Sequence, residues 1–360
     1  MAKFLSREEY KAREKQARFY APVRRRWWLV LTVVLVIVAA GIGIRVVLFP
    51  GRPLVFDTGS VAPGPVAVSP DGSTLYMASF SSGPPCGGLL ETFSTKTGQA
   101  GWGIQIFDGG PQAMVMAPDG RTLYVVTCSG TVVPVSTATG QQGTPIRTGD
   151  ASAGWQGLGI AITPDGRTLF VAGKSLIPVS TVTGKPGAPI GVAGTNPVIS
   201  PDGHTLYLAT SARNRSAITP VDLATGASQR PVWLPSSVYD MTVSPDSRTL
   251  YVAGPRGIVP VDTATSTAGT LLETRYKNVA SMVITPDGRT LYAATWRNGT
   301  VLPISLHTGK AGTPVRVAMN GVTGCPTNLT LSHHTLYVTN AGPACMNQFE
   351  GDIAVLPAGG

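Results

Sequence analysis

The sequence predicts an all-β protein, a seven-bladed propeller of four-stranded antiparallel blades preceded by one transmembrane helix. Three observations support this prediction. The 43 glycines and 30 prolines are spread along all 360 residues, which is typical of short strands joined by tight turns. One turn-and-strand motif recurs seven times at a mean spacing of 43.5 residues, a period typical of propeller blades. A long apolar run precedes the first copy.

The apolar run covers residues 27–49. Its first 18 residues, Trp27 to Ile44, carry no charge, and as a helix they would span roughly 27 Å, close to the thickness of a bilayer core. The sequence therefore predicts a transmembrane helix over 27–49. A signal peptide cleaved after Ala40 is the alternative interpretation, because small residues precede that position.

The charge of the chain is concentrated before this run. Residues 1–26 hold nine Lys or Arg and three Glu, so they supply most of the formal net charge of +9. Basic residues flanking a membrane helix stay on the cytoplasmic side, which predicts a cytoplasmic tail over 1–26 and an extracytoplasmic propeller over 50–360. The propeller region itself carries little net charge, so we expect no nucleic-acid partner.

The repeated motif combines a tight turn with the strand that follows it. In its fullest form, TPDGRTLYAAT at 285–295, Pro-Asp-Gly favours a turn and Thr-Leu-Tyr alternates as a strand. An apolar stretch before each turn completes a hairpin. The aromatic residues of the copies are Tyr76, Tyr124, Phe170, Tyr207, Tyr251, Tyr292 and Tyr337.

A third strand and a short fourth strand follow each hairpin. The third strand reads TVVPVSTATG at 131–140 and similar stretches elsewhere, and it contains a proline that a central strand accepts only at a bulge or an unpaired position. The last copy ends after its third strand, at 351–360. We therefore expect the stretch 51–59 to supply the missing fourth strand and close the ring, which removes exposed strand edges.

These units resemble the YVTN-type β-propeller repeats, and Tyr337 to Asn340 spell that motif. The resemblance covers about residues 51–360. It implies a cell-surface, secreted or periplasmic propeller that acts as a binding module. Related seven-bladed folds include lactonases, which keeps an enzyme as an alternative.

Four cysteines fall near the starts of first strands or the ends of second strands, positions that share one end of a propeller. Outside the cytoplasm they could form disulfides, and of the three pairings we favour Cys325–Cys345 and Cys86–Cys128. The four histidines and the six aspartates of the Pro-Asp turns show no ligand spacing. We expect no metal, no cofactor and no catalytic residue.

Long loops at that same end carry aromatic and arginine side chains, which are favoured at binding hot spots. The candidate ligand-binding residues are Trp155, Tyr239, Asp240, Arg275, Tyr276, Trp296 and Arg297. The predicted function is a monomeric, membrane-anchored extracytoplasmic binding or scaffold module for a protein, a cell-wall polysaccharide or a small ligand. The alternative is a lactonase- or lyase-type enzyme with its site at the mouth of the central channel.

Overall fold

A computed structural model describes residues 54–57, 63–81, 87–106, 108–149, 158–212, 215–272, 277–319, 322–341 and 351–358. The chain divides into two units, Met1–Arg52 and Pro53–Gly360, and only the second is described. The predicted transmembrane helix over 27–49 therefore lies outside the described residues. Within the described part of the chain, no helix is long and apolar enough to cross a membrane.

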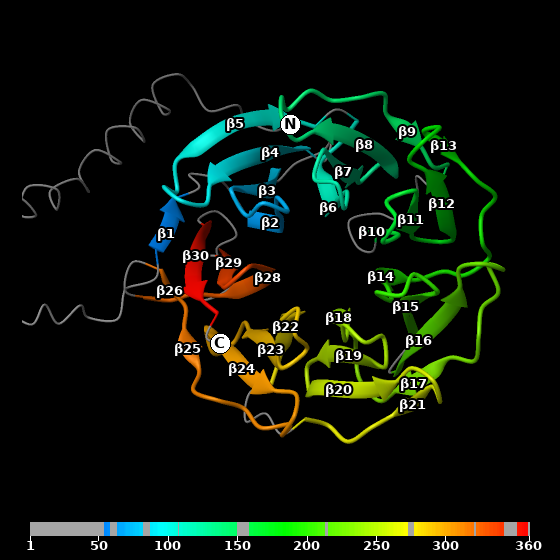
Figure 1. The fold of residues 1–360 in the computed structure, drawn as a ribbon, viewed down its shortest axis with the longest axis vertical. Helices are drawn as coiled ribbons and strands as arrows, with labels where there is room; N and C mark the ends of the chain where they lie inside the picture. Colours follow the sequence, from blue (N-terminus) through cyan, green and yellow to red (C-terminus); the bar gives the residue numbers. More distant parts are fainter. Residues whose placement is uncertain are drawn as a thin grey trace, which may run out of the picture. The chain divides into compact units, whose positions relative to one another are not determined.

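Seven four-stranded antiparallel sheets make up this unit, arranged as the blades of a propeller (Figure 1). Blades 1 to 3 consist of β2 (Pro63–Val68), β3 (Thr74–Ser81), β4 (Gly87–Ser94) and β5 (Ala100–Gln105); β6 (Pro111–Met116), β7 (Thr122–Thr127), β8 (Thr131–Ser136) and β9 (Ile146–Arg147); and β10 (Gly159–Ile162), β11 (Thr168–Ala172), β12 (Leu176–Ser180) and β13 (Lys185–Pro186).

The first strand of each blade lies nearest the centre of the ring and the fourth lies at its rim (Figure 1).

Blades 4 to 6 consist of β14 (Thr195–Ile199), β15 (Thr205–Ala212), β16 (Arg215–Asp222) and β17 (Val232–Leu234); β18 (Asp240–Val243), β19 (Thr249–Gly254), β20 (Gly257–Asp262) and β21 (Thr267–Ala268); and β22 (Val279–Ile284), β23 (Thr290–Thr295), β24 (Thr300–Ser305) and β25 (Val315–Arg316).

Blade 7 combines strands from both ends of this unit. It contains β28 (Pro326–Ser332), β29 (Thr335–Ala341) and β30 (Gly351–Pro357), and its fourth strand is β1 (Leu54–Asp57). β1 runs antiparallel to β30, with Leu54 opposite Val355 and Asp57 opposite Asp352. A separate two-stranded hairpin, β26 (Ala318–Met319) with β27 (Val322–Thr323), lies between blades 6 and 7 in the sequence.

The Pro-Asp turns are held by their own aspartates. In blade 5 the hydroxyl of Ser244 donates to Asp246 Oδ1 at 2.6 Å, and the backbone N–H of Arg248 donates to the same oxygen at 3.1 Å. These hydrogen bonds, with that of Ser244 acting first, hold the pKa of Asp246 below its usual value. The aspartates of the Pro-Asp turns in blades 1, 3, 4 and 6 show the same pattern, so these carboxylates have a structural role.

The Leu-Tyr pair of each repeat, which is Leu-Phe in blade 3, joins a blade to both of its neighbours. Tyr251 of blade 5 packs in a cluster with Met282 and Leu291 of blade 6. Leu250, on the opposite face of the same strand, packs in a cluster with Tyr207 and Ile218 of blade 4. All seven repeats follow this rule, and seven clusters fill the seven boundaries between blades. The repeat therefore places an apolar side chain on each face of the second strand, so that both faces of each blade are buried.

The third-strand prolines occupy one equivalent position, opposite the aromatic residue of the second strand. Pro260 pairs with Tyr251, and its carbonyl accepts a 2.7 Å hydrogen bond from Gly269 on the rim side. The ladder between second and third strands has no register shift at these prolines. The missing N–H is tolerated because it faces the short rim strand and leaves the central ladder intact. A bulge in that ladder, which the sequence allows, is absent at these positions.

Candidate functional site

The candidate site is the end of the propeller where first strands begin and second strands end; we call it the β18 end. Of the predicted ligand-binding residues, the structure describes Tyr239, Asp240, Trp296 and Arg297, all of them at this end of blades 5 and 6. The other three, Trp155, Arg275 and Tyr276, lie outside the described residues.

Tyr239 stands directly before β18, and its backbone is fixed from two sides. Its N–H donates to the carbonyl of Ala253 at 2.9 Å, and its carbonyl accepts from Asn196 Nδ2 of blade 4 at 3.0 Å. The side chain of Tyr239 is 41% exposed. A ring held on a fixed backbone and open to solvent loses little freedom when a ligand packs against it.

Asp240 joins blade 5 to blade 6. Its Oδ1 accepts from the N–H of Met241 at 2.8 Å, and its Oδ2 accepts from the N–H of Met282 in β22 at 2.7 Å. Burial raises the pKa of Asp240 from 3.8 to about 6, and the hydrogen bonds from Met282, Met241 and Ser281 offset only part of that rise. The carboxylate thus acts as an acceptor for backbone amides of two inner strands.

The position of Asp240 in the repeat is used for the same purpose in other blades. Asn196 of blade 4 donates to Tyr239 O, as described above. In blade 6, Ser281 Oγ accepts from Leu329 N of blade 7 at 3.2 Å. In blade 7, Asn328 Nδ2 donates to Gly64 O of blade 1 at 3.2 Å. The signal in the sequence was a polar residue, in blades 4 to 7, four positions before the Ser or Thr that opens the turn between the first two strands, and sequence reasoning did not use it.

Trp296 and Arg297 form the turn between β23 and β24. The guanidinium carbon of Arg297 lies 5.4 Å from the centre of the Trp296 ring, within the range of a cation–π interaction. The Trp296 side chain is half-buried and Arg297 is exposed. This pair presents a flat, positively charged surface on the blade next to Tyr239.

Two of the four cysteines are described. Neither Cys128 nor Cys325 is a free thiol. Cys86 and Cys345 lie outside the described residues, so the pairings Cys86–Cys128 and Cys325–Cys345 stay predictions.

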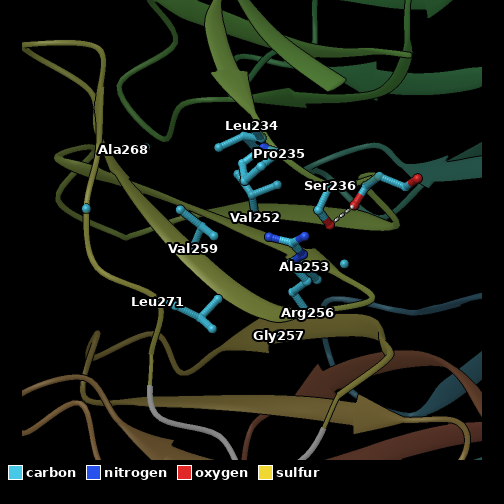
Figure 2. Close-up of a pocket in the computed structure, with 13 residues that line it drawn as sticks. Leu234, Pro235, Ser236, Val252, Ala253, Arg256, Gly257, Val259, Ala268 and Leu271 are labelled. Carbon is cyan, nitrogen blue, oxygen red and sulfur yellow. Dashed lines mark hydrogen bonds between the residues drawn. The ribbon is translucent and has the colours of Figure 1, made fainter. Parts of the chain in front are cut away.

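A pocket of about 250 Å³ lies between blades 4 and 5 at the β18 end (Figure 2). Two segments of this end line it, the loop 235–237 before β18 and the turn 254–257 after β19. The rest of the lining comes from the blades themselves and is largely apolar: Leu234, Val252, Ala253, Val259, Ala268, Gly269 and Leu271.

Arg256 is the charged residue of this pocket lining. It lies in the turn between β19 and β20, and Figure 2 shows its side chain reaching from that turn toward Ser236 and Val252. Arg256 is exposed, and no carboxylate of the described residues lies within ion-pair distance of it. Sequence reasoning missed Arg256, because one arginine in a short Pro-Arg-Gly turn carries no signal of its own.

Gly254 sets how closely the loop approaches the turn. A Cβ at this position would lie 2.3 Å from the carbonyl oxygen of Ser237 and 3.2 Å from Ser236 Oγ. The loop therefore rests directly on the backbone of Gly254. The hydroxyl of Ser236 donates to the carbonyl of Ser237 at 3.3 Å, which holds this part of the loop together (Figure 2).

The opposite end of the propeller carries a larger hollow. It measures about 800 Å³ and lies between blades 6 and 7, where His307, His333 and His334 line it with Asp287 and Arg289. Within the described ranges, no group of three or more His, Cys, Asp or Glu side chains could hold a metal ion. Arg289 already lies 3.9 Å from Asp287, so the cation of this hollow has a carboxylate beside it.

No family model matches the chain, and no curated protein matches it. Among solved structures the chain is similar to one described as Kuenenia stuttgartiensis Hydrazine Synthase, with a TM-score of 0.68 and 19% sequence identity. The match covers 88% of this chain and 99% of that chain. At this level of identity the likeness supports the propeller fold and carries nothing about activity.

Proposed function

We propose that the protein is a membrane-anchored, extracytoplasmic propeller that acts as a binding or scaffold module through its β18 end. The observation that carries this proposal is the largely apolar pocket between blades 4 and 5 at the β18 end, the same end at which Tyr239 is exposed. A concave apolar surface with a few fixed polar groups is the usual form of a binding site. The ligand would be a protein, a cell-wall polysaccharide or a small molecule.

Anchoring rests on the sequence of residues 1–49. The apolar run over 27–49, which is uncharged from Trp27 to Ile44, is long enough to span a bilayer, and the basic residues of 1–26 favour a cytoplasmic N-terminus. We also propose membership of the YVTN-type repeat family, which likewise rests on the sequence, through the seven turn-and-strand copies. The predicted disulfides Cys86–Cys128 and Cys325–Cys345 would fit an oxidising compartment, and neither described cysteine is a free thiol.

The location is tested by adding a protease to intact cells that express the full-length chain with an N-terminal epitope tag. We expect the propeller to be cleaved while the tag and the segment 1–26 stay protected. Protection of the whole chain in intact cells, with cleavage only after lysis, would contradict the extracytoplasmic assignment.

The binding face is tested with soluble cell-wall polysaccharide fragments and the purified full-length chain, using the shift in melting temperature. We expect a stabilising shift that Tyr239→Ser and Trp296→Ser reduce, because both rings lie at the β18 end. His307→Ala is the matched control, since it changes a ring at the opposite end. If His307→Ala reduces the shift in melting temperature and the two β18-end variants do not, the ligand binds at the opposite end and the proposal is wrong.

A further inference from the structure

We propose that the pocket between blades 4 and 5 binds a small apolar carboxylate, with the carboxylate held by Arg256 and the apolar part inserted between the blades. The inference rests on the proposed binding function and names the ligand class of one part of that face. It follows from three features of the pocket, which are the chemistry of its wall, the position of its one charge and its size.

The wall favours an apolar group. Leu234 and Val252 are buried side chains from the facing blades 4 and 5, and Val259 is half-buried in β20. Leu271, which follows β21, is 41% exposed and stands at the rim of the same pocket. Apolar surface that is open to water at a concave site is stabilised when an apolar ligand covers it.

The charge favours an anion at one end of that ligand. A guanidinium binds a carboxylate through two parallel hydrogen bonds, which makes arginine the preferred partner for this group. Arg256 has no carboxylate of the described residues within ion-pair distance, whereas Arg289 in the opposite hollow has Asp287. The groups beside Arg256 in Figure 2, Ser236 and Val252, are neutral, so neither of them compensates its charge.

The size limits the ligand to a small molecule. The volume of about 250 Å³ lies at or below the lower end of the range for ligand pockets. A short alkyl chain or a single ring suits such a space, and a nucleotide or a long lipid does not. The loop already lies in direct contact with the backbone of Gly254, so it cannot move closer to the turn 254–257.

The test compares octanoate with octanamide, which have the same chain and differ in charge at pH 7. Each is titrated into the purified full-length chain, with binding followed by isothermal titration calorimetry. We expect octanoate to bind at least about tenfold more tightly than octanamide, because a charge-assisted hydrogen bond contributes more than a neutral one. Equal affinity for the two ligands, or no binding of octanoate, would overturn the proposal.

Two variants locate the site. Arg256→Gln should weaken octanoate binding by roughly tenfold or more and leave octanamide unchanged. Val259→Phe should reduce the binding of both ligands, because the phenylalanine side chain is larger than that of valine and takes up space in the pocket. Arg248→Gln is the matched control, since Arg248 lies in a turn of the same blade at the opposite end and should bind octanoate like the unaltered chain.

The outcomes separate this inference from the wider proposal. If octanoate binding is unchanged in Arg256→Gln, the carboxylate site is wrong even where polysaccharide binding still depends on Tyr239. If polysaccharide does not bind while octanoate binds through Arg256, the carboxylate site is supported and polysaccharide is rejected as a ligand. Melting temperatures of all variants, measured without ligand, show that each one is folded.

Discussion

The carboxylate of Asp240 in blade 5 accepts a 2.7 Å hydrogen bond from the backbone N–H of Met282 in blade 6. Burial raises the pKa of this carboxyl group to about 6. Because the folded-state pKa lies above the ordinary value of 3.8, the folded state binds the proton more tightly between these two values. Stability should therefore fall as the pH rises from about 4 to about 6, and stay at that lower level above it.

We predict that lowering the pH from 7.5 to 5 raises the free energy of unfolding by roughly 1–1.5 kcal/mol. Urea denaturation at the two pH values measures this change. Asp240→Asn removes the titrating group and should flatten the dependence, although it also costs stability because its amide NH₂ faces a backbone donor. An equal pH response in the variant would show that another group is responsible.

The aspartates of the Pro-Asp turns predict the opposite response in stronger acid. The hydroxyl of Ser69 lowers the pKa of Asp71 to about 2, with help from Ser73. A carboxyl group with a lowered pKa stabilises the fold above its unfolded value of 3.8, and that contribution is lost as the pH falls toward 2. We expect maximum stability between roughly pH 4 and 5. Asp71→Asn should weaken the loss below pH 4, and a profile that keeps rising down to pH 2 would contradict this account.

Tyr251 should be one of the costly positions for truncation. Its ring is 8% exposed and packs between blades 5 and 6. We predict that Tyr251→Ala lowers the free energy of unfolding by roughly 3–5 kcal/mol and Tyr251→Phe by much less. Phe170 already fills the equivalent position in blade 3. Val182→Ala is the control, because this 79% exposed side chain should contribute less than about 0.5 kcal/mol.

The Thr-Leu-Tyr repeat explains why the fold could be predicted from the sequence. The number of its copies predicted the number of blades, and its alternation predicted the two buried faces that Leu250 and Tyr251 occupy. The pocket could not be predicted, because Arg256 and Leu271 meet Leu234 only through the packing of two blades. The hydrogen bond from Met282 to Asp240 likewise depends on the spacing of neighbouring inner strands, which a sequence does not contain.

The pairing of β1 with β30 leads to a prediction about closure. We infer that this four-residue ladder closes the ring, because it joins the beginning and the end of the propeller in one sheet. A chain that starts at residue 58 should unfold at a lower temperature and aggregate more readily than a chain that starts at residue 53, since the edge of β30 is then unpaired. Both chains lack residues 1–52, so the comparison isolates β1. Equal melting temperatures would show that the ring does not depend on this strand.

Gly254 should not tolerate a side chain, because the loop before β18 rests on it. A Cβ there would lie 2.3 Å from the carbonyl oxygen of Ser237, far closer than atoms in contact allow. We predict that Gly254→Ala displaces the loop 235–237, lowers the free energy of unfolding by roughly 1–3 kcal/mol and changes the shape of the pocket that Arg256 lines. Gly191→Ala is the matched control, because a Cβ at Gly191 meets nothing within 4 Å and should be neutral or slightly stabilising. Thermal unfolding measures the difference in stability between the two variants. Equal stability would mean that the loop 235–237 moves aside without a loss of stability.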